Sequence, residues 1–190
     1  MKLHLPLRSL LWLVLGCLMI AVPLSMIARK EYIISQGETF RFRLAPVDPV
    51  DPFRGRFMTL NFEVERKMHT IPSDEGDPAT PLTCFALIEN DPQGYAQIGN
   101  ISLQEPYGGY YLKLSILRNH SGRLRLPFNR YYMNETLAPL VEKQARDLIQ
   151  EATRTGQPSP VYALVRIHGG EGVITSLSGP KGPLTGGSGN

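Results

Sequence analysis

The sequence predicts an α+β fold made mainly of antiparallel β-sheet with one amphipathic helix, preceded by an N-terminal transmembrane helix. Three observations support this prediction. Twenty uncharged residues run from Ser9 to Ala28, several later segments alternate apolar and polar side chains, and one segment after Asn134 repeats apolar residues at helical spacing. The 16 prolines and 18 glycines indicate many turns, which disfavours a helical bundle.

The apolar segment 9–28 is predicted to be an uncleaved transmembrane signal anchor, preceded by a short N-terminal tail at 1–8. Twenty helical residues span about 30 Å, the thickness of the hydrocarbon core of a bilayer. Trp12 near one end and the pair Arg29 and Lys30 at the other end suit the two membrane interfaces. The lipid bilayer is therefore expected to be one partner of this protein.

Two alternatives share the positively charged start of the chain with an uncleaved anchor. A cleaved signal peptide is disfavoured because the apolar run is longer than a usual signal core, and because Met26 stands where the best cleavage site needs a small side chain. A lipoprotein site at Gly16-Cys17 is disfavoured because Leu15 is bulky and the residues after the cysteine are apolar rather than a polar tether. The anchor remains the preferred interpretation.

The formal net charge of +3 divides unevenly along the chain. Residues 1–30 contain four cations and no acid, so the remaining residues hold 16 Lys and Arg against 17 Asp and Glu. This balance argues against nucleic acid as a partner, because phosphate binding needs net positive charge on the binding face.

Long domains cross membranes largely regardless of flanking charge. We expect the amino terminus inside and the domain on the extracytoplasmic side, periplasmic or extracellular.

The β-rich domain is expected at 31–178, followed by a flexible tail at 179–190 that is rich in Gly, Pro and Ser. Glu31 to Ser35 is expected to be extended. Period-two alternation and turn signals predict about eight strands in the domain. The strands are placed at 39–44, 56–65, 82–89, 95–103, 110–117, 122–128, 161–168 and 172–177.

A single amphipathic helix is predicted, with Asn134 as its N-cap and its end before Gly156. Glu135 lies in its first turn, where the helix dipole stabilises a negative charge. The buried face consists of apolar residues at helical spacing: Leu137, Val141, Ala145, Leu148 and Ala152.

The most distinctive motif is the proline-rich segment before the second strand. Asp48 and Asp51 stand three residues apart in a stiff loop, and Arg54 and Gly55 follow. Arg54 can act as an anion clamp in a ligand or partner site, or it can form a bidentate contact with one of the aspartates in a purely structural corner. A calcium site is less well supported, because calcium needs six to eight oxygen ligands.

This segment, with Gly55, Phe57, Leu60 and Phe62, resembles the signature of the membrane-anchored GDYXXLXY proteins. Gly55 and Leu60 match the motif, the two phenylalanines replace its tyrosines, and Arg56 replaces its aspartate. The later block 126–135, which ends in a glutamate before the helix, resembles a second block of this family. The resemblance implies an N-terminal anchor and a domain of this architecture. It implies no reaction.

The second block is also a candidate surface in its own right. Arg123, Arg125 and Arg130, together with Tyr131 and Tyr132, can form a basic, aromatic face for an anionic ligand or lipid headgroups. The alternative is that the arginines are the solvated side of a strand, because Leu124 and Leu126 alternate with them.

No metal site, cofactor motif or catalytic set is predicted. The histidines are far apart in the sequence and none has helical metal-ligand spacing, and the two cysteines, Cys17 and Cys84, cannot form a zinc site. Cys17 lies in the apolar segment and Cys84 in an apolar strand, so no internal disulfide is expected.

These observations predict a non-catalytic binding or accessory protein that is anchored in the membrane by one helix and acts on another membrane or envelope component. The expected macromolecular partner is another membrane protein. Binding is assigned to Asp48, Asp51, Arg54, Gly55, Tyr132 and Glu135. The alternative is an envelope ligand sensor or hydrolase that uses Asp48, Asp51, Arg54 and Glu135, which requires these groups to converge in space.

Overall fold

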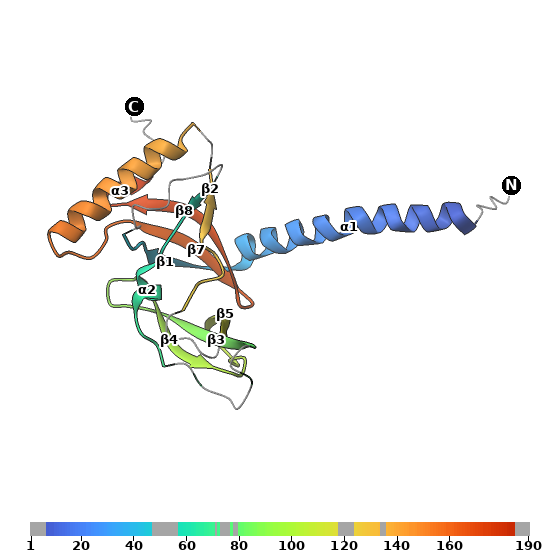
Figure 1. The fold of residues 1–190 in the computed structure, drawn as a ribbon, viewed down its shortest axis with the longest axis horizontal. Coiled ribbons are helices and arrows are strands. Elements are labelled where there is room, and N and C mark those ends of the chain that lie inside the picture. The colour runs from blue at the N-terminus through green and yellow to red at the C-terminus, as the bar shows by residue number, and fades with distance from the viewer. Residues whose placement is uncertain are drawn as a thin grey trace.

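The computed structural model describes residues 7–46, 57–70, 72, 77, 80–117, 124–133 and 136–184. Its elements, in chain order, are α1 (Leu7–Gln36), β1 (Glu38–Arg43), β2 (Phe57–Thr59), α2 (Glu63–Arg66), β3 (Pro81–Asn90), β4 (Ala96–Ser102), β5 (Tyr110–Leu117), β6 (Arg130–Tyr132), α3 (Ala138–Arg154), β7 (Tyr162–His168), β8 (Glu171–Gly179) and β9 (Gly182–Pro183). Figure 1 shows α1 projecting away from the body that the other elements form.

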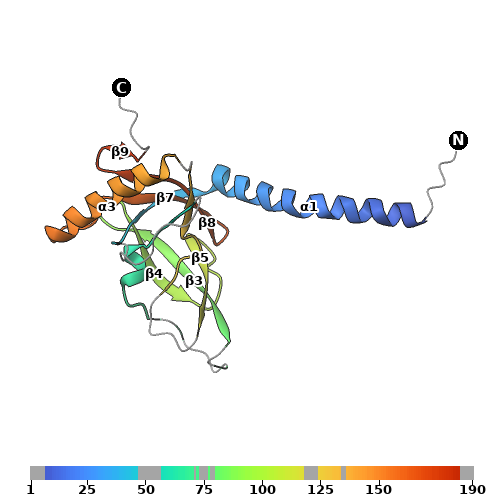
Figure 2. The same ribbon diagram turned by 45° about the horizontal axis from the view of Figure 1, so that its top comes forward.

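Three antiparallel sheets make up the body. Their strand orders are β1-β7-β8-β9, β2-β6 and β4-β3-β5. The α3 helix lies beside β7 and β8, while β3, β4 and β5 form a separate layer on the other side of β1 (Figures 1 and 2). The predicted α+β class, with mainly antiparallel sheet and an N-terminal apolar helix, is confirmed.

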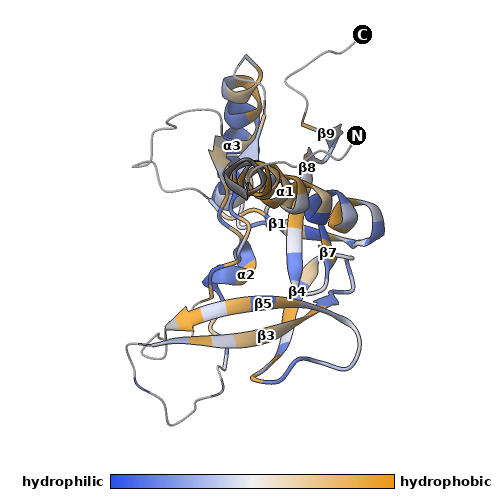
Figure 3. Cartoon of the chain, turned by 90° about the vertical axis from the view of Figure 1, so that its right-hand side faces the viewer, coloured by the Kyte–Doolittle hydropathy of each residue, from blue (hydrophilic) through white to orange (hydrophobic). Residues whose placement is uncertain are grey.

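The alternation that predicted the strands is visible in the burial of their side chains. Phe40, Phe42 and Leu44 are buried in and just after β1, and colours alternate along β3 and β5 in Figure 3. Buried side chains from each of the three sheets and from α3 join one hydrophobic cluster. One core therefore holds the layers together.

The expectation of an extended segment from Glu31 to Ser35 is wrong, because α1 continues as a helix to Gln36. Ile33 is only 2% exposed, and the guanidinium of Arg166 donates to the carbonyl oxygens of Ile34 and Ser35. These carbonyls belong to the last turn, where a helix lacks internal donors. Contacts with β7 thus extend the helix beyond its apolar segment.

The strand expected at 56–65 ends at Thr59, and Glu63–Arg66 forms the short helix α2. Met58, Leu60, Phe62 and Val64 are nevertheless all buried. The pattern correctly predicted which side chains enter the core. It did not predict the backbone conformation that delivers them.

The strand expected at 122–128 is also absent from the described part of this segment, residues 124–128. Leu124, Leu126 and Phe128 are buried as the alternation predicted. The backbone N–H of Leu126 donates to a carboxylate oxygen of Glu65 at 2.7 Å, in place of a neighbouring strand. The strand of this region is β6, which begins only at Arg130.

The predicted helix is α3, but its first turn lies later than expected. Leu137 is the N-cap rather than Asn134, which lies outside the described residues, and a proline occupies the first turn. Val141, Ala145 and Ala152 are buried as predicted, together with Ile149. Leu137 is 40% exposed, so it lies outside the buried face.

The ordered domain extends past the expected boundary at 178. Strand β9 pairs with β8, the backbone N–H of Leu184 donates to the carbonyl of Leu177 at 2.9 Å, and the Leu184 side chain is 9% exposed. The described part of the predicted tail therefore packs on the core.

Candidate functional site

The two sequence blocks that resembled family motifs pair with each other. Strands β2 and β6 form an antiparallel ribbon in which Phe57 lies opposite Tyr132, Met58 opposite Tyr131 and Thr59 opposite Arg130. Seventy or more residues of chain separate these partners. The ribbon is therefore the structural element that the two blocks build together.

Of the six predicted binding residues, the structure describes Tyr132. Its side chain is 65% exposed on β6. Asp48, Asp51, Arg54, Gly55 and Glu135 lie outside the described residues, so their convergence remains a prediction. In an antiparallel pair the start of one strand faces the end of the other. Phe57, the first residue of β2, thus lies opposite Tyr132, the last residue of β6.

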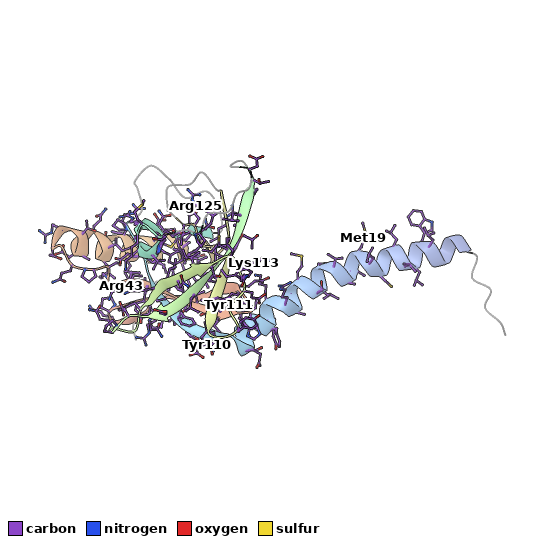
Figure 4. The ribbon with its side chains drawn as sticks, turned by 90° about the horizontal axis from the view of Figure 1, so that it is seen from below. Met19, Arg43, Tyr110, Tyr111, Lys113 and Arg125 are labelled. Carbon is purple, nitrogen blue, oxygen red and sulfur yellow. The ribbon has the colours of Figure 1, made fainter. Side chains whose placement is uncertain are left out.

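The basic, aromatic surface predicted at the second block is divided. Arg123 lies outside the described residues, whereas Arg125 and Arg130 are exposed while Leu124 and Leu126 are buried. Figure 4 shows Arg125 near the edge of the body, away from α1. This pattern fits the solvated side of a chain segment.

Two residues of the first block, Leu60 and Phe62, are packing residues. Leu60 is 1% exposed and Phe62 is fully buried. The ring of Phe62 lies edge-on to Phe42 and Phe128, with centroids 5.8 and 5.7 Å apart. Phe42 and Phe128 complete the triangle at 5.5 Å. Edge-to-face packing at these distances is favourable for aromatic rings, so the block anchors β1, α2 and the segment before β6 to one another.

Glu65 of α2 fixes this corner by hydrogen bonds. One carboxylate oxygen accepts from the backbone N–H of Phe62 at 3.1 Å, and the other accepts from Leu126 at 2.7 Å. Glu63 accepts from the backbone N–H of Ser159 at 3.2 Å. Both carboxylates satisfy backbone donors that would otherwise be partly buried without partners.

A second polar centre, where α1 meets the domain, was missed by the sequence analysis. Glu171 at the start of β8 pairs with Arg29 at 2.7 Å and with Lys30 at 3.3 Å. Arg29 and Lys30 were assigned only to the membrane interface. Their partner lies 141 residues from Lys30, and no local pattern identifies it.

Apolar and backbone contacts reinforce this junction. The ring of Tyr32 lies edge-on to His168 with centroids 5.2 Å apart. A Cβ at Gly37 would lie 2.5 Å from the carbonyl oxygen of Ile33 and 3.1 Å from the backbone nitrogen of Ile167. Only glycine allows this approach of the two backbones. Together with the Arg166 cap, these contacts hold the end of α1 on the β7–β8 hairpin.

The described residues contain no group of three or more His, Cys, Asp or Glu side chains that could hold a metal ion. Cys84 is buried, and Cys17 lies on the exposed surface of α1. The hydroxyl of Tyr111 donates to Glu105, and this hydrogen bond raises the pKa of Tyr111 above its usual value. Burial raises the pKa of Glu142, partly offset by Arg146.

The fold and these contacts define a class of protein: a β-rich α+β domain fixed to the end of a long, exposed apolar helix. Leu11–Gln36 is long and apolar enough to cross a membrane, and it is compatible with either an anchor or a signal sequence. The chain belongs to the GDYXXLXY protein family, whose model matches residues 19–177. No curated protein and no solved structure matches the chain.

Proposed function

We propose that this protein is a membrane-anchored, non-catalytic binding or accessory domain for another membrane or envelope component. One observation carries the proposal: α1 is a continuous helix whose first part is exposed and apolar and whose last turns pack against the domain. A helix held in this way fixes the orientation of the domain relative to the membrane. A flexible Gly/Ser linker would leave that orientation free.

The junction supports an anchor that stays on the protein. Arg29, Lys30 and Ile33 contact the domain while belonging to the same continuous helix as the apolar residues before them. None of the apolar window of that helix is buried by the rest of the chain. Exposed apolar surface on this scale is stable in lipid rather than in water.

The domain is proposed to face the extracytoplasmic side. A reporter fused after Asn190 that is active only outside the cytoplasm should give signal, and a reporter active only inside should not. The reverse pair of results would place the domain in the cytoplasm and restrict its partners to that compartment.

Affinity purification tests the binding role. The full chain, tagged at its C-terminus and extracted in a mild detergent after chemical crosslinking, should recover a membrane protein in stoichiometric amount. A control in which an unrelated transmembrane helix carries the same tag corrects for nonspecific recovery. Repeated recovery of the bare protein would contradict the proposed function.

A further inference from the structure

An arginine–tyrosine cluster lies on the outer face of the sheet that carries the junction. In β1 and β7, Phe40, Phe42, Ala163, Val165 and Ile167 point into the core. The alternate residues share the opposite face, where Arg43 is paired with Tyr162 and Arg41 with Leu164. The cluster consists of Arg41, Arg43, Tyr162 and, from the β3–β4 turn, Gln93 and Tyr95.

The guanidinium of Arg43 is held in place by stacking. It lies 3.8 Å from the ring centroid of Tyr95, and its Nη2 donates to the side-chain oxygen of Gln93. Tyr95 lies edge-on to Tyr162 at 5.7 Å, and the guanidinium of Arg41 lies 5.8 Å from the Tyr162 ring. The two cations and two rings thus form one continuous surface.

The β3–β4 turn is organised before any partner binds. One carboxylate oxygen of Asp91 accepts from the backbone N–H groups of Gln93 and Tyr95, both at 2.8 Å. Gly94 adopts the left-handed conformation that this turn needs. The turn presents Tyr95 to Arg43 in a fixed position. Such preorganisation lowers the entropy cost of binding.

The positive charge of this face is offset only in part: Asp91 of the β3–β4 turn interacts electrostatically with Arg43. Among the described residues, no carboxylate forms an ion pair with Arg41 or Arg43. Arg41 is exposed, and the Nε of Arg43 is buried without a hydrogen-bond partner. Arginines that lie beside tyrosines and form no close ion pair within the described part of the chain are typical of surfaces that bind anionic groups of a partner.

The position of the cluster favours a protein rather than a lipid headgroup as the source of the anion. From Glu38 to Arg43 the strand advances about 17 Å at the usual rise per residue. Figure 1 shows β1 running away from the end of α1, and Figure 4 shows Arg43 on the part of the body far from α1. A bilayer around the apolar part of α1 lies on the opposite side.

We propose that the Arg41–Arg43–Tyr95–Tyr162 face binds an acidic segment of the partner protein. The proposal rests on the proposed function and adds the chemistry of the partner and the face that contacts it. Carboxylates of the partner accept from the guanidinium groups, and the tyrosine rings supply rigid contact area.

The test uses the full chain in detergent micelles and a short fluorescein-labelled oligoglutamate peptide, followed by fluorescence anisotropy. The wild-type chain should bind this peptide saturably, with affinity that falls as salt rises, and should not bind an oligoglutamine peptide. The double variant R41Q/R43Q should bind about tenfold more weakly, the effect of losing charge-assisted hydrogen bonds.

Charge-matched and structural controls keep this result interpretable. R146Q/R154Q removes two positive charges from α3 and should bind oligoglutamate like the wild type. Because Arg43 also contacts the β3–β4 turn, Arg41→Gln serves as a variant that leaves that contact intact. It should weaken binding about threefold, as expected for one exposed charge pair.

Three results would overturn the inference. In the first, the wild type shows no saturable binding of oligoglutamate. In the second, R41Q/R43Q and R146Q/R154Q bind the peptide equally well. In the third, R41Q/R43Q still binds the peptide like the wild type but no longer binds phosphatidylserine vesicles. The purification separates this failure from that of the proposed function. If both the wild type and R41Q/R43Q recover the same partner equally, only the binding face is wrong; if the wild type recovers none, the proposed function fails.

Discussion

Replacing Gly172 by alanine should destabilise the domain, because the space beside this residue is filled by an aromatic ring. A Cβ at Gly172 would lie 2.5 Å from Cδ1 of Phe128 and 3.2 Å from Cγ1 of Val165. Phe128 is 7% exposed and packs edge-on against Phe42 and Phe62, which are fully buried. The ring therefore has little room to move away.

The magnitude follows from overpacking of a close-packed core. Forcing one extra methyl group into such a site costs about 1–3 kcal/mol. For a chain of this length, each kcal/mol corresponds to about 2–4 °C in melting temperature. We expect Gly172→Ala to melt roughly 4–8 °C below the wild type for a cost near 2 kcal/mol. Thermal unfolding of the detergent-solubilised chain, followed by circular dichroism, measures this shift.

Two further variants sharpen the measurement. A Cβ at Gly108 would meet nothing within 4 Å, so Gly108→Ala should melt like the wild type. Phe128→Leu in the Gly172→Ala background should recover part of the loss, because the two sites share one contact and their effects are not additive. A Gly172→Ala chain that melts like the wild type, or a double variant with purely additive loss, would refute the packing argument.

Three other changes test the junction and the β3–β4 turn. Glu171→Gln removes the shared partner of two exposed cations, so it should speed proteolysis near the end of α1 while changing unfolding free energy by less than about 1 kcal/mol per pair; equal cleavage rates would contradict the role of Glu171. Gly37→Ala should release the same helix end more strongly, since its Cβ would meet backbone atoms that cannot turn aside, and hydrogen exchange of residues 29–36 measures this; unchanged protection would show that the approach is not needed. The backbone N–H of Tyr95 holds the pKa of Asp91 below its usual 3.8, helped by Gln93 and opposed by desolvation. A carboxylate with a lowered pKa stabilises the fold above its unfolded pKa, and this contribution is lost as the pH falls through the folded value. Asp91→Asn should therefore lower the melting temperature at neutral pH and by less at pH values below 3.8; a difference that is constant with pH would exclude this linkage.

Burial was easier to predict from the sequence than backbone conformation. Met58, Leu60, Phe62 and Val64 alternate and all reach the core, yet the chain changes from strand to helix between the second and the fourth. In this short helix the carboxylate of Glu65 accepts a hydrogen bond from the backbone N–H of Leu126, which lies 61 residues away in the sequence. The alternation of apolar and polar residues indicates which side chains face the core. Tertiary hydrogen bonds determine whether the backbone between them is a strand or a helix.

The candidate sites show the same limit more strongly. The ribbon residues were noticed because their sequence blocks are distinctive, but nothing local indicates that Phe57 pairs with Tyr132. The predicted alternation placed Arg41 and Arg43 on one side of a strand without showing what they face. Tyr95, which stacks on Arg43, was expected as the first residue of the strand at 95–103, and nothing in its local sequence indicates that contact. Contacts between elements far apart in sequence carry the chemistry here.

The outer face of β1 and β7 is divided between two roles by the way α1 ends. Where β7 meets the end of α1, Arg166 donates to the carbonyl oxygen of Ile34 and His168 packs edge-on against Tyr32. At the other end, Arg41 lies against the ring of Tyr162 and Arg43 against the ring of Tyr95. A flexible linker in place of this helix end would leave the orientation of the second half relative to α1 undefined. Under the proposed function, the contact of the helix end with β7 would present the arginine–tyrosine face to a partner in the same membrane at one height and in one orientation. Such a fixed orientation would reduce the orientational constraint that limits association rates.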